Sequence, residues 1–229
     1  KYTERVAEHF RSRGIEIDFY EIGNEIDFGV PGAYEKRWSH RFQMDWMKQE
    51  IWPDAAKIIG AAQKGVRKAD PQAKFMLHLT QWWNPSFATE FYLTMMEHGV
   101  VVDYLGLSYF PSSNLEEDNR ISDLLDSVEQ LTSEVDRPLM ISEFAYPDTA
   151  VIRGQFAEWN QPVSGYSLSP KGQARWIRDF IERIEEDPNI QRAYYWSPEW
   201  YTQSIWSPFS LFDREGQAKP AFSALSRTK

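Results

Sequence analysis

The chain has 229 residues, of which 42% are hydrophobic and 26% charged, and its formal net charge is −9. This size and composition indicate a globular protein of one large or two small domains. The negative charge would repel nucleic acid and anionic membranes, so neither is expected as a partner. No apolar run reaches membrane-spanning length, no signal peptide is recognisable at the N-terminus, and the lack of cysteine excludes disulfide and thiolate chemistry.

Apolar periodicity predicts helices and strands in alternation. In chain order they are a helix over 2–13, a strand at 17–22, a helix over 42–69 with a break near Pro53, a strand at 74–79, a helix over 85–98, a strand at 103–110, a helix over 121–131, a strand at 138–144, a helix over 170–184, a strand at 190–196 and a short helix over 220–227. The segment after 17–22 is expected to be a loop, since it carries Pro31 and Gly32. Ser169 is the expected N-cap of the helix over 170–184.

Apolar strands that alternate with helices predict an α/β fold with a parallel sheet. No repeat, low-complexity tract or linker interrupts the pattern, so a single domain over 1–229 is expected. A doubly wound nucleotide-binding fold would need a glycine-rich turn, and "EIGNEI" (21–26) is not one. A (β/α)8 barrel instead places its working residues at the carboxyl ends of the strands. All five strand ends here are polar or amphipathic, which favours the barrel: Asn24-Glu25, His78, Ser108-Tyr109, Ser142-Glu143 and Tyr195-Trp196.

Two of these strand ends carry a glutamate, Glu25 and Glu143. Retaining glycoside hydrolysis uses two carboxyl groups about 5–5.5 Å apart, one as nucleophile and one as acid and then base. Either glutamate alone is more often a solvated side chain. Because both end apolar strands in an aromatic-rich α/β chain, the pair favours catalysis.

Several longer stretches carry a family resemblance. They are "EIGNEIDFG", "MLHLTQWWN", "VDYLGLSYFP", "ISEFAYP", "YSLSPKGQARWI" and "AYYWSPEW". Together they resemble clan A of the retaining (β/α)8 glycosidases, and within it most closely family 53, the endo-β-1,4-galactanases. "GLSYFP", "SPKGQA" and "YYWSPEW" are the specific ones, while Asn-Glu alone indicates only the clan. The resemblance implies that the five strands are strands four to eight of the barrel.

The resemblance also implies roles for individual residues. Glu25 would be the acid/base and Glu143 the nucleophile. Asn24 would bind the sugar 2-hydroxyl, Trp196 would form the floor of the −1 subsite, and His78 and Tyr109 would shape its wall, with the Tyr109 hydroxyl available to hold Glu143. Trp82, Trp83 and Trp200 would stack on sugar rings along the cleft. For His78 and the three tryptophans, plain packing at a strand end or rim remains the open alternative.

The expected activity is therefore a retaining endo-glycosidase acting on a β-linked plant-type polysaccharide, with β-1,4-galactan favoured and a secreted or extracytoplasmic location. Departures from the family pattern at 27–40, at "TQWWN" and at Ser197 leave the substrate open. The alternatives are another clan A glycanase, such as a mannanase or xylanase, or a carbohydrate-binding relative without turnover. No cofactor and no metal are expected, because Asp148, Glu158 and Asn160 in the 144–168 loop lack calcium-loop spacing.

Five strands are fewer than a barrel needs, since a complete one typically takes about 250 residues. The domain is therefore expected to be incomplete at its N-terminus. Either the chain is part of a longer protein, or another chain fills the gap, for example in a segment-exchanged dimer. Unpaired strand edges would promote such association.

Overall fold

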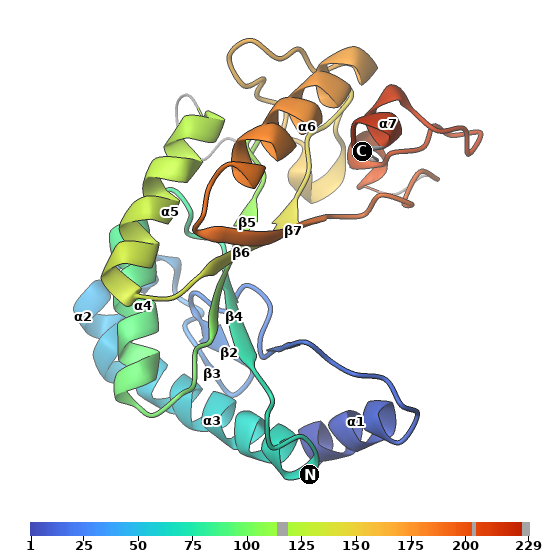
Figure 1. Ribbon diagram of the computed structural model, residues 1–229. Helices are drawn as coiled ribbons and strands as arrows, with labels where there is room; N and C mark the ends of the chain where they lie inside the picture. Colours follow the sequence, from blue (N-terminus) through green and yellow to red (C-terminus); the bar gives the residue numbers. More distant parts are fainter. Residues whose placement is uncertain (114–118, 203–204, 226–229) are drawn as a thin grey trace. The chain divides into compact units, whose positions relative to one another are not determined.

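The computed structural model describes residues 1–113, 119–202 and 205–225 (Figure 1). The helices and strands in order are α1 (Tyr2–Arg11), β1 (Tyr20–Glu21), β2 (Gly29–Val30), β3 (Ala33–Tyr34), η1 (Trp38–His40), α2 (Met44–Trp46), η2 (Met47–Ile51), α3 (Trp52–Ala69), β4 (Phe75–Leu79), α4 (Pro85–Glu97), β5 (Tyr104–Tyr109), α5 (Ile121–Val135), β6 (Leu139–Phe144), η3 (Gly154–Phe156), α6 (Pro170–Glu185), β7 (Ile190–Tyr195), η4 (Ser207–Phe209) and α7 (Pro220–Leu225). The predicted alternation is confirmed, and the last two residues of the predicted 220–227 helix lie outside the described residues.

The five main strands form one sheet in the order β1-β4-β5-β6-β7. β1 runs parallel to β4 with Tyr20 opposite Phe75, and β4 runs parallel to β5 with His78 opposite Gly106. Consecutive strands are neighbours because each helical connection returns the chain to the same edge of the growing sheet. The predicted α/β fold with a parallel sheet is therefore confirmed.

The chain divides into two compact units. The first comprises Lys1–Ser108 and Val128–Met140, and the second Tyr109–Ser127 and Ile141–Lys229. The division passes through β5, α5 and β6, so each of these elements contributes residues to both units. The expectation of a single domain stays a prediction.

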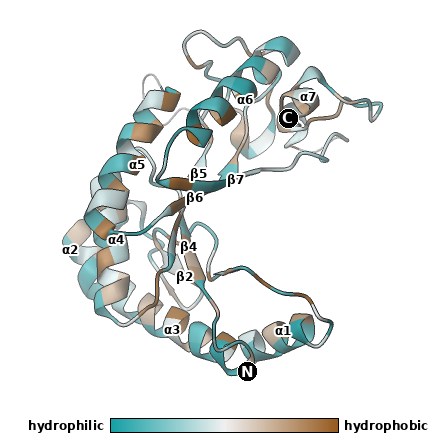
Figure 2. Ribbon diagram, viewed as in Figure 1, coloured by the Kyte–Doolittle hydropathy of each residue, from teal (hydrophilic) through white to brown (hydrophobic). Residues whose placement is uncertain are grey.

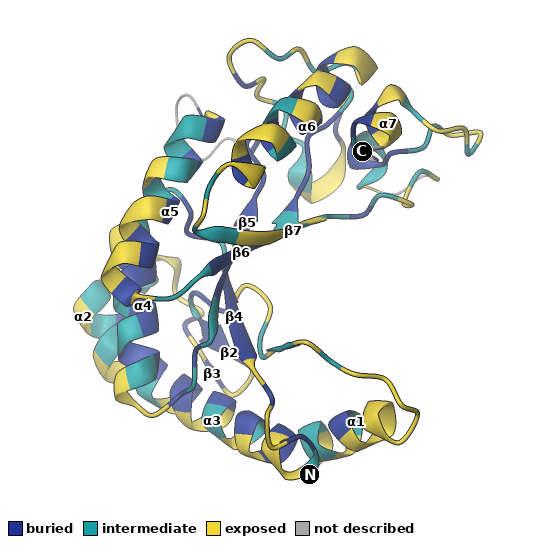
Figure 3. Ribbon diagram, viewed as in Figure 1, coloured by how far each residue is buried: buried dark blue, intermediate teal, exposed yellow. Residues whose placement is uncertain are grey.

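In the first unit, α1 packs against α3, and the buried core beneath them is formed by Ala7, Val66, Ala73 and Phe75. A Cβ atom at Gly65 of α3 would lie against the Thr3 hydroxyl of α1, so glycine permits this close approach. All five residues of β4 are buried, as Figure 3 shows. The helices carry hydrophobic and hydrophilic residues on different sides, as an amphipathic pattern requires (Figure 2).

Two sequence predictions for this unit need correction. The segment with Pro31 and Gly32 is not a plain loop, because β2 and β3 form an antiparallel hairpin across it. Gly32 has φ 99°, and Pro followed by a glycine of positive φ is the pairing that a type II turn favours. The predicted strand at 17–22 is also too long, since only Tyr20–Glu21 forms a strand.

The predicted helix over 42–69 is confirmed in its main part, as α3. Its predicted break near Pro53 corresponds to the π-helical turn η2 (Met47–Ile51) directly before α3. Pro53 itself lies in the first turn of α3, where a missing N–H leaves no internal hydrogen bond unmade.

The core of the second unit is aromatic. On α6, Trp176 and Phe180 stack with ring centroids 5.0 Å apart, and Phe144 of β6 lies 4.7 Å from Phe180. Ser169 accepts a hydrogen bond from the Gly172 N–H at the start of α6, which confirms the predicted N-cap. In the part of the chain that the structure describes, no helix combines the length and apolarity that crossing a membrane would require.

Candidate active site

Glu25 follows β1 in a turn that stays bonded to the neighbouring strand. The Ile22 N–H donates to the Met76 carbonyl at 3.0 Å, and the Ile26 N–H donates to the His78 carbonyl at 3.0 Å. Between these two bonds the backbone bulges, and Glu25 takes φ 50°, in the left-handed region that costs a non-glycine residue about 1–3 kcal/mol. This conformation places an exposed carboxylate at the end of β1, and strain of this kind concentrates at functional sites.

The Glu25 carboxylate is held by a serine from β5. Ser108 Oγ donates a hydrogen bond of 2.8 Å to Glu25 Oε1, and Ser108 is only 3% exposed. The sequence predictions gave Ser108 no role of its own. In the structure His78 lies opposite Gly106, and Ser108 is two residues further along on the same face of β5, a register that the sequence does not reveal.

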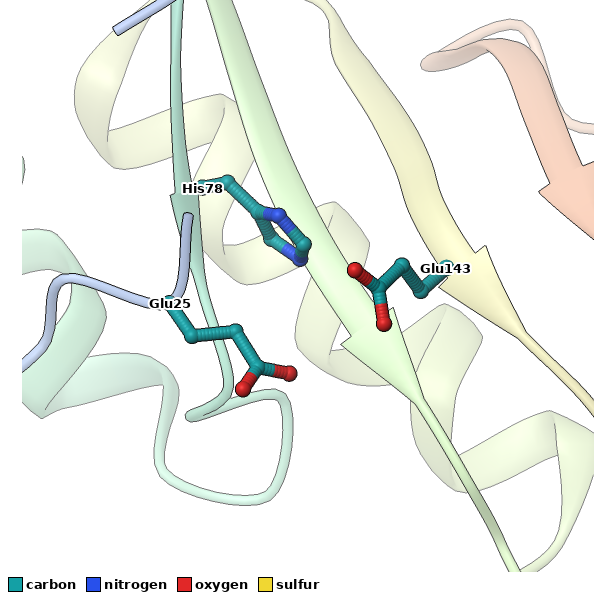
Figure 4. A group of neighbouring side chains, drawn as sticks. All are labelled: Glu25, His78 and Glu143. Carbon is teal, nitrogen blue, oxygen red and sulfur yellow. The ribbon is translucent and has the colours of Figure 1, made fainter. Parts of the chain in front are cut away.

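His78 lies between two polar side chains. Its Nε2 is 2.7 Å from Ser108 Oγ, and its Nδ1 is 3.0 Å from Glu21 Oε1. The ring is 1% exposed, so it is a buried histidine with both nitrogens engaged. The structure therefore links His78 to Glu25 through Ser108. Figure 4 shows the Glu25 side chain leaving the segment after β1 and the His78 side chain leaving β4.

Asp27 is a buried carboxyl group two residues after the exposed Glu25. It accepts a hydrogen bond of 2.8 Å from the Thr80 N–H, and its own carbonyl accepts one of 3.0 Å from Trp52 Nε1. Burial raises the pKa of Asp27 to about 6, and the charge of Glu25 adds to the increase. Asp27 therefore ties the turn after β1 to the end of β4.

Three further predicted residues belong to the same unit. Asn24 is exposed next to Glu25, where a sugar hydroxyl could reach it. Trp82 and Trp83 meet edge to face with centroids 6.0 Å apart. Trp82 is 3% exposed, so protein covers its ring, which favours the packing alternative over stacking on sugar. Trp83 is half-buried and keeps that prediction open.

Glu143 lies near the end of β6, in the second unit (Figure 4). Its neighbour Phe144 packs against Phe180 at 4.7 Å and Tyr195 at 5.2 Å. Successive side chains of a strand point to opposite faces, so Glu143 projects from the face of β6 opposite these aromatic residues.

Tyr109 lies in the aromatic core of the second unit. It is fully buried, its ring lies 5.5 Å from Phe180 and 5.9 Å from Trp176, and its hydroxyl donates to the Asn119 carbonyl at 3.0 Å. Burial raises the pKa of Tyr109 well above its ordinary value. The Tyr109 hydroxyl thus donates to a backbone carbonyl, and strand alternation turns the ring toward α6, so the predicted wall position stays a prediction.

Trp196 continues from β7, where its N–H donates to the Phe144 carbonyl at 2.9 Å. Its half-buried ring lies 5.9 Å from Trp200, which is 44% exposed. The structure thus brings these two predicted residues together. Four further aromatic residues, which the sequence predictions missed, pack in the same cluster: Phe110, Phe156, Trp159 and Trp206. Two of them, Phe156 and Trp159, belong to the 144–168 loop, so the sequence contained a signal for them.

The oxygen-bearing residues of the 144–168 loop have other partners. Lys219 Nζ lies 3.0 Å from Asp148 Oδ2 and donates to the Ser210 carbonyl at 2.8 Å. Asn160 Oδ1 accepts from Gln161 Nε2 at 3.1 Å, and Glu158 is exposed. A lysine ammonium thus supplies the positive charge next to Asp148.

Comparisons with known proteins identify the family of this chain. The sequence profile of glycosyl hydrolase family 53 matches residues 1–225. An uncharacterised protein from the bgaB 5′ region of Niallia circulans is 27% identical over 98% of this chain and 63% of its own length. An arabinogalactan endo-β-1,4-galactanase A from Aspergillus niger is 26% identical over 87% of this chain and 54% of its own length. The chain thus spans less than two thirds of the length of these two relatives.

Solved structures show the same fold. A fungal β-1,4-galactanase superposes with a TM-score of 0.77 at 21% identity, over 99% of this chain and 67% of that one. The family 53 catalytic domain from Ignisphaera aggregans gives a TM-score of 0.74 at 22% identity, over 97% of this chain and 62% of that one. The fold is therefore of the clan A barrel type, and the chain belongs to glycosyl hydrolase family 53.

Proposed function

We propose that this chain carries the catalytic glutamates of a retaining endo-glycosidase whose substrate is a β-linked plant-type polysaccharide. The favoured substrate is β-1,4-galactan. Family membership supports glycoside hydrolysis, and relatives named arabinogalactan endo-β-1,4-galactanase favour galactan. The observation that carries the proposal is Glu25: an exposed carboxylate in a left-handed turn, hydrogen-bonded by a buried serine.

In the proposed mechanism, Glu143 attacks the anomeric carbon while Glu25 donates its proton to the departing glycosidic oxygen. The resulting glycosyl–Glu143 ester is then hydrolysed by a water whose proton Glu25 accepts. Asn24, exposed beside Glu25, would bind the 2-hydroxyl of the reacting sugar. Trp196 would support that sugar from below, and Trp200 and Trp83 would stack on neighbouring units.

A polysaccharide cannot cross a membrane unaided, so such an enzyme would act outside the cytoplasm. The chain covers only part of the length of its relatives. We therefore propose full activity for an assembly in which the barrel is complete.

A panel of galactan, arabinogalactan, mannan and xylan, assayed for new reducing ends, tests the substrate. Galactan cleavage is expected, and cleavage of mannan or xylan alone would transfer the assignment to another clan A activity. Retention in affinity gels without any release of sugar would indicate a carbohydrate-binding relative instead. The stereochemistry is tested by proton NMR on an aryl-linked oligosaccharide, where the β-anomer should appear first; the α-anomer first would exclude double displacement.

A further inference from the structure

Four polar side chains of the first unit form a continuous line of hydrogen bonds. Glu21 Oε1 lies 3.0 Å from His78 Nδ1, His78 Nε2 lies 2.7 Å from Ser108 Oγ, and Ser108 Oγ lies 2.8 Å from Glu25 Oε1. The residues come from β1, β4, β5 and the turn after β1. Every distance is within the range of a true hydrogen bond.

The two ends of this line differ in exposure from its middle. His78 and Ser108 are 1% and 3% exposed, whereas the Glu21 side chain is 34% exposed and Glu25 is exposed as well. A buried imidazole and a buried hydroxyl thus connect two carboxylates that each reach solvent. Gly106 lies opposite His78 in the register of β4 and β5, two residues before Ser108.

The number of protons on these four side chains determines which hydrogen bonds the line can form. The Ser108 hydroxyl has one hydrogen, which it donates either to Glu25 or to His78 Nε2. When it donates to an ionised Glu25, Nε2 must carry a proton to complete the line, and His78 is an imidazolium with its Nδ1–H on Glu21. When Glu25 is protonated and donates to Ser108, the serine donates to an unprotonated Nε2, and His78 is neutral with its Nδ1–H still on Glu21.

We propose that His78 and Ser108 form a proton relay to Glu25, with the Glu21 carboxylate holding His78 in place. This inference rests on the proposed role of Glu25 as acid/base. In the step, Ser108 gives its hydroxyl proton to Glu25 Oε1 and takes the Nε2 proton of His78. An imidazolium and a carboxylate become an imidazole and a carboxylic acid, with one proton moved and no charge created.

The relay gives Glu25 a second proton source besides bulk water. In the resting enzyme His78 can supply the proton that makes Glu25 an acid, and after Glu25 has protonated the leaving group it stays ionised as the base until it accepts the proton of the attacking water. His78 and Ser108 are positioning residues in this scheme, since they act on the substrate only through Glu25.

Leaving-group dependence tests the relay, because a dinitrophenol leaving group needs no protonation and an alcohol does. In Ser108→Ala and His78→Gln, kcat/KM on an unactivated oligosaccharide should fall at least about 10-fold further than on the dinitrophenyl glycoside. The matched control is Thr132→Val, which removes a buried hydroxyl with a 2.7 Å hydrogen bond to the Val128 carbonyl on α5. In Thr132→Val, the ratio of kcat/KM on the oligosaccharide to kcat/KM on the dinitrophenyl glycoside should stay at the wild-type value. Equal losses on both substrates in Ser108→Ala would overturn the relay.

A second measurement does not depend on activity. At one fixed pH, ¹⁵N NMR of the ring nitrogens reports the protonation of His78, and His78→Gln assigns its signals among the four histidines. Glu25→Gln removes the charge at one end of the line and should lower the protonated fraction at Nε2, and Glu21→Gln should weaken the preference for a proton on Nδ1. Unchanged His78 signals in both variants would refute the relay. If no glycoside is cleaved but the signals shift as expected, the proposed function fails and the hydrogen-bonded coupling stands.

Discussion

Ser108 and Glu25 are 83 positions apart in sequence and are joined by a hydrogen bond of 2.8 Å from the serine hydroxyl to the glutamate carboxylate. This bond connects the carboxyl end of β5 to the turn after β1, across the intervening strand β4. It explains how an exposed glutamate in the turn after a short strand is held in one orientation. Proton transfer at an acid/base group depends on such fixed geometry.

The two glutamates should respond differently to substitution. Glu25→Gln is expected to lose about 10²–10⁴-fold in kcat on polysaccharide, the usual contribution of general acid–base catalysis. Azide can replace the missing base in the second step, so Glu25→Ala with a good leaving group should recover turnover and yield a β-glycosyl azide. Glu143→Gln should be inactive on every substrate and gain no β-azide product. Substantial activity in Glu143→Gln would show that the nucleophile is assigned to the wrong residue.

Asp27 should make the stability of the protein depend on pH. Burial raises its pKa from 3.8 to about 6, so the folded state prefers the protonated acid. Well below pH 4 the group is protonated in both states. Between pH 4 and 6 the unfolded state loses this proton first, which lowers the free energy of unfolding by roughly 3 kcal/mol at most, and above pH 6 the effect levels off. Asp27→Asn keeps an oxygen for the Thr80 N–H and should not show this decrease.

Urea unfolding of wild type and Asp27→Asn at pH 4, 5, 6 and 7 measures the difference. The stability of the variant relative to wild type should increase across this range. Asp54→Asn on α3 is the control, since that carboxyl is 62% exposed and pairs with the surface lysine Lys57. Parallel pH profiles for wild type and Asp27→Asn would contradict the prediction.

Tyr109→Phe distinguishes a core position from a sugar contact. Removing the hydroxyl leaves the buried Asn119 carbonyl without this donor, and a loss of about 1 kcal/mol in the free energy of unfolding is expected. KM for oligosaccharides should stay within about 2-fold of wild type, because the ring packs against α6. Trp200→Ala provides the contrast. Loss of its exposed ring should raise KM and have little effect on the free energy of unfolding. A large increase in KM for Tyr109→Phe would restore the sugar-contact interpretation.

The association state can be measured directly. Within the described residues, the sheet order places β1 and β7 at its two ends. Terminal strands favour pairing with further strands, so light scattering on the 229-residue chain should detect a dimer or larger species. A cooperatively unfolding monomer with full glycosidase activity would refute this expectation.

Much of this protein follows from local sequence. Apolar periodicity predicted the alternating helices and strands, and Ser169 predicted the start of α6, because these signals act between residues close in the chain. The stretches "GLSYFP", "SPKGQA" and "YYWSPEW" led to the family, which the profile match over residues 1–225 then showed.

Tertiary packing decided which side chains at a strand end face which way. Sequence shows that neighbouring residues of a strand alternate, but not which of Ser108 and Tyr109 faces Glu25. That choice is made by Trp176 and Phe180 of α6, which bury the Tyr109 ring and thereby turn Ser108 to the opposite face. The same dependence on distant neighbours buries Trp82. Contacts between residues far apart in the chain carry no local signal, so only the folded structure fixes them.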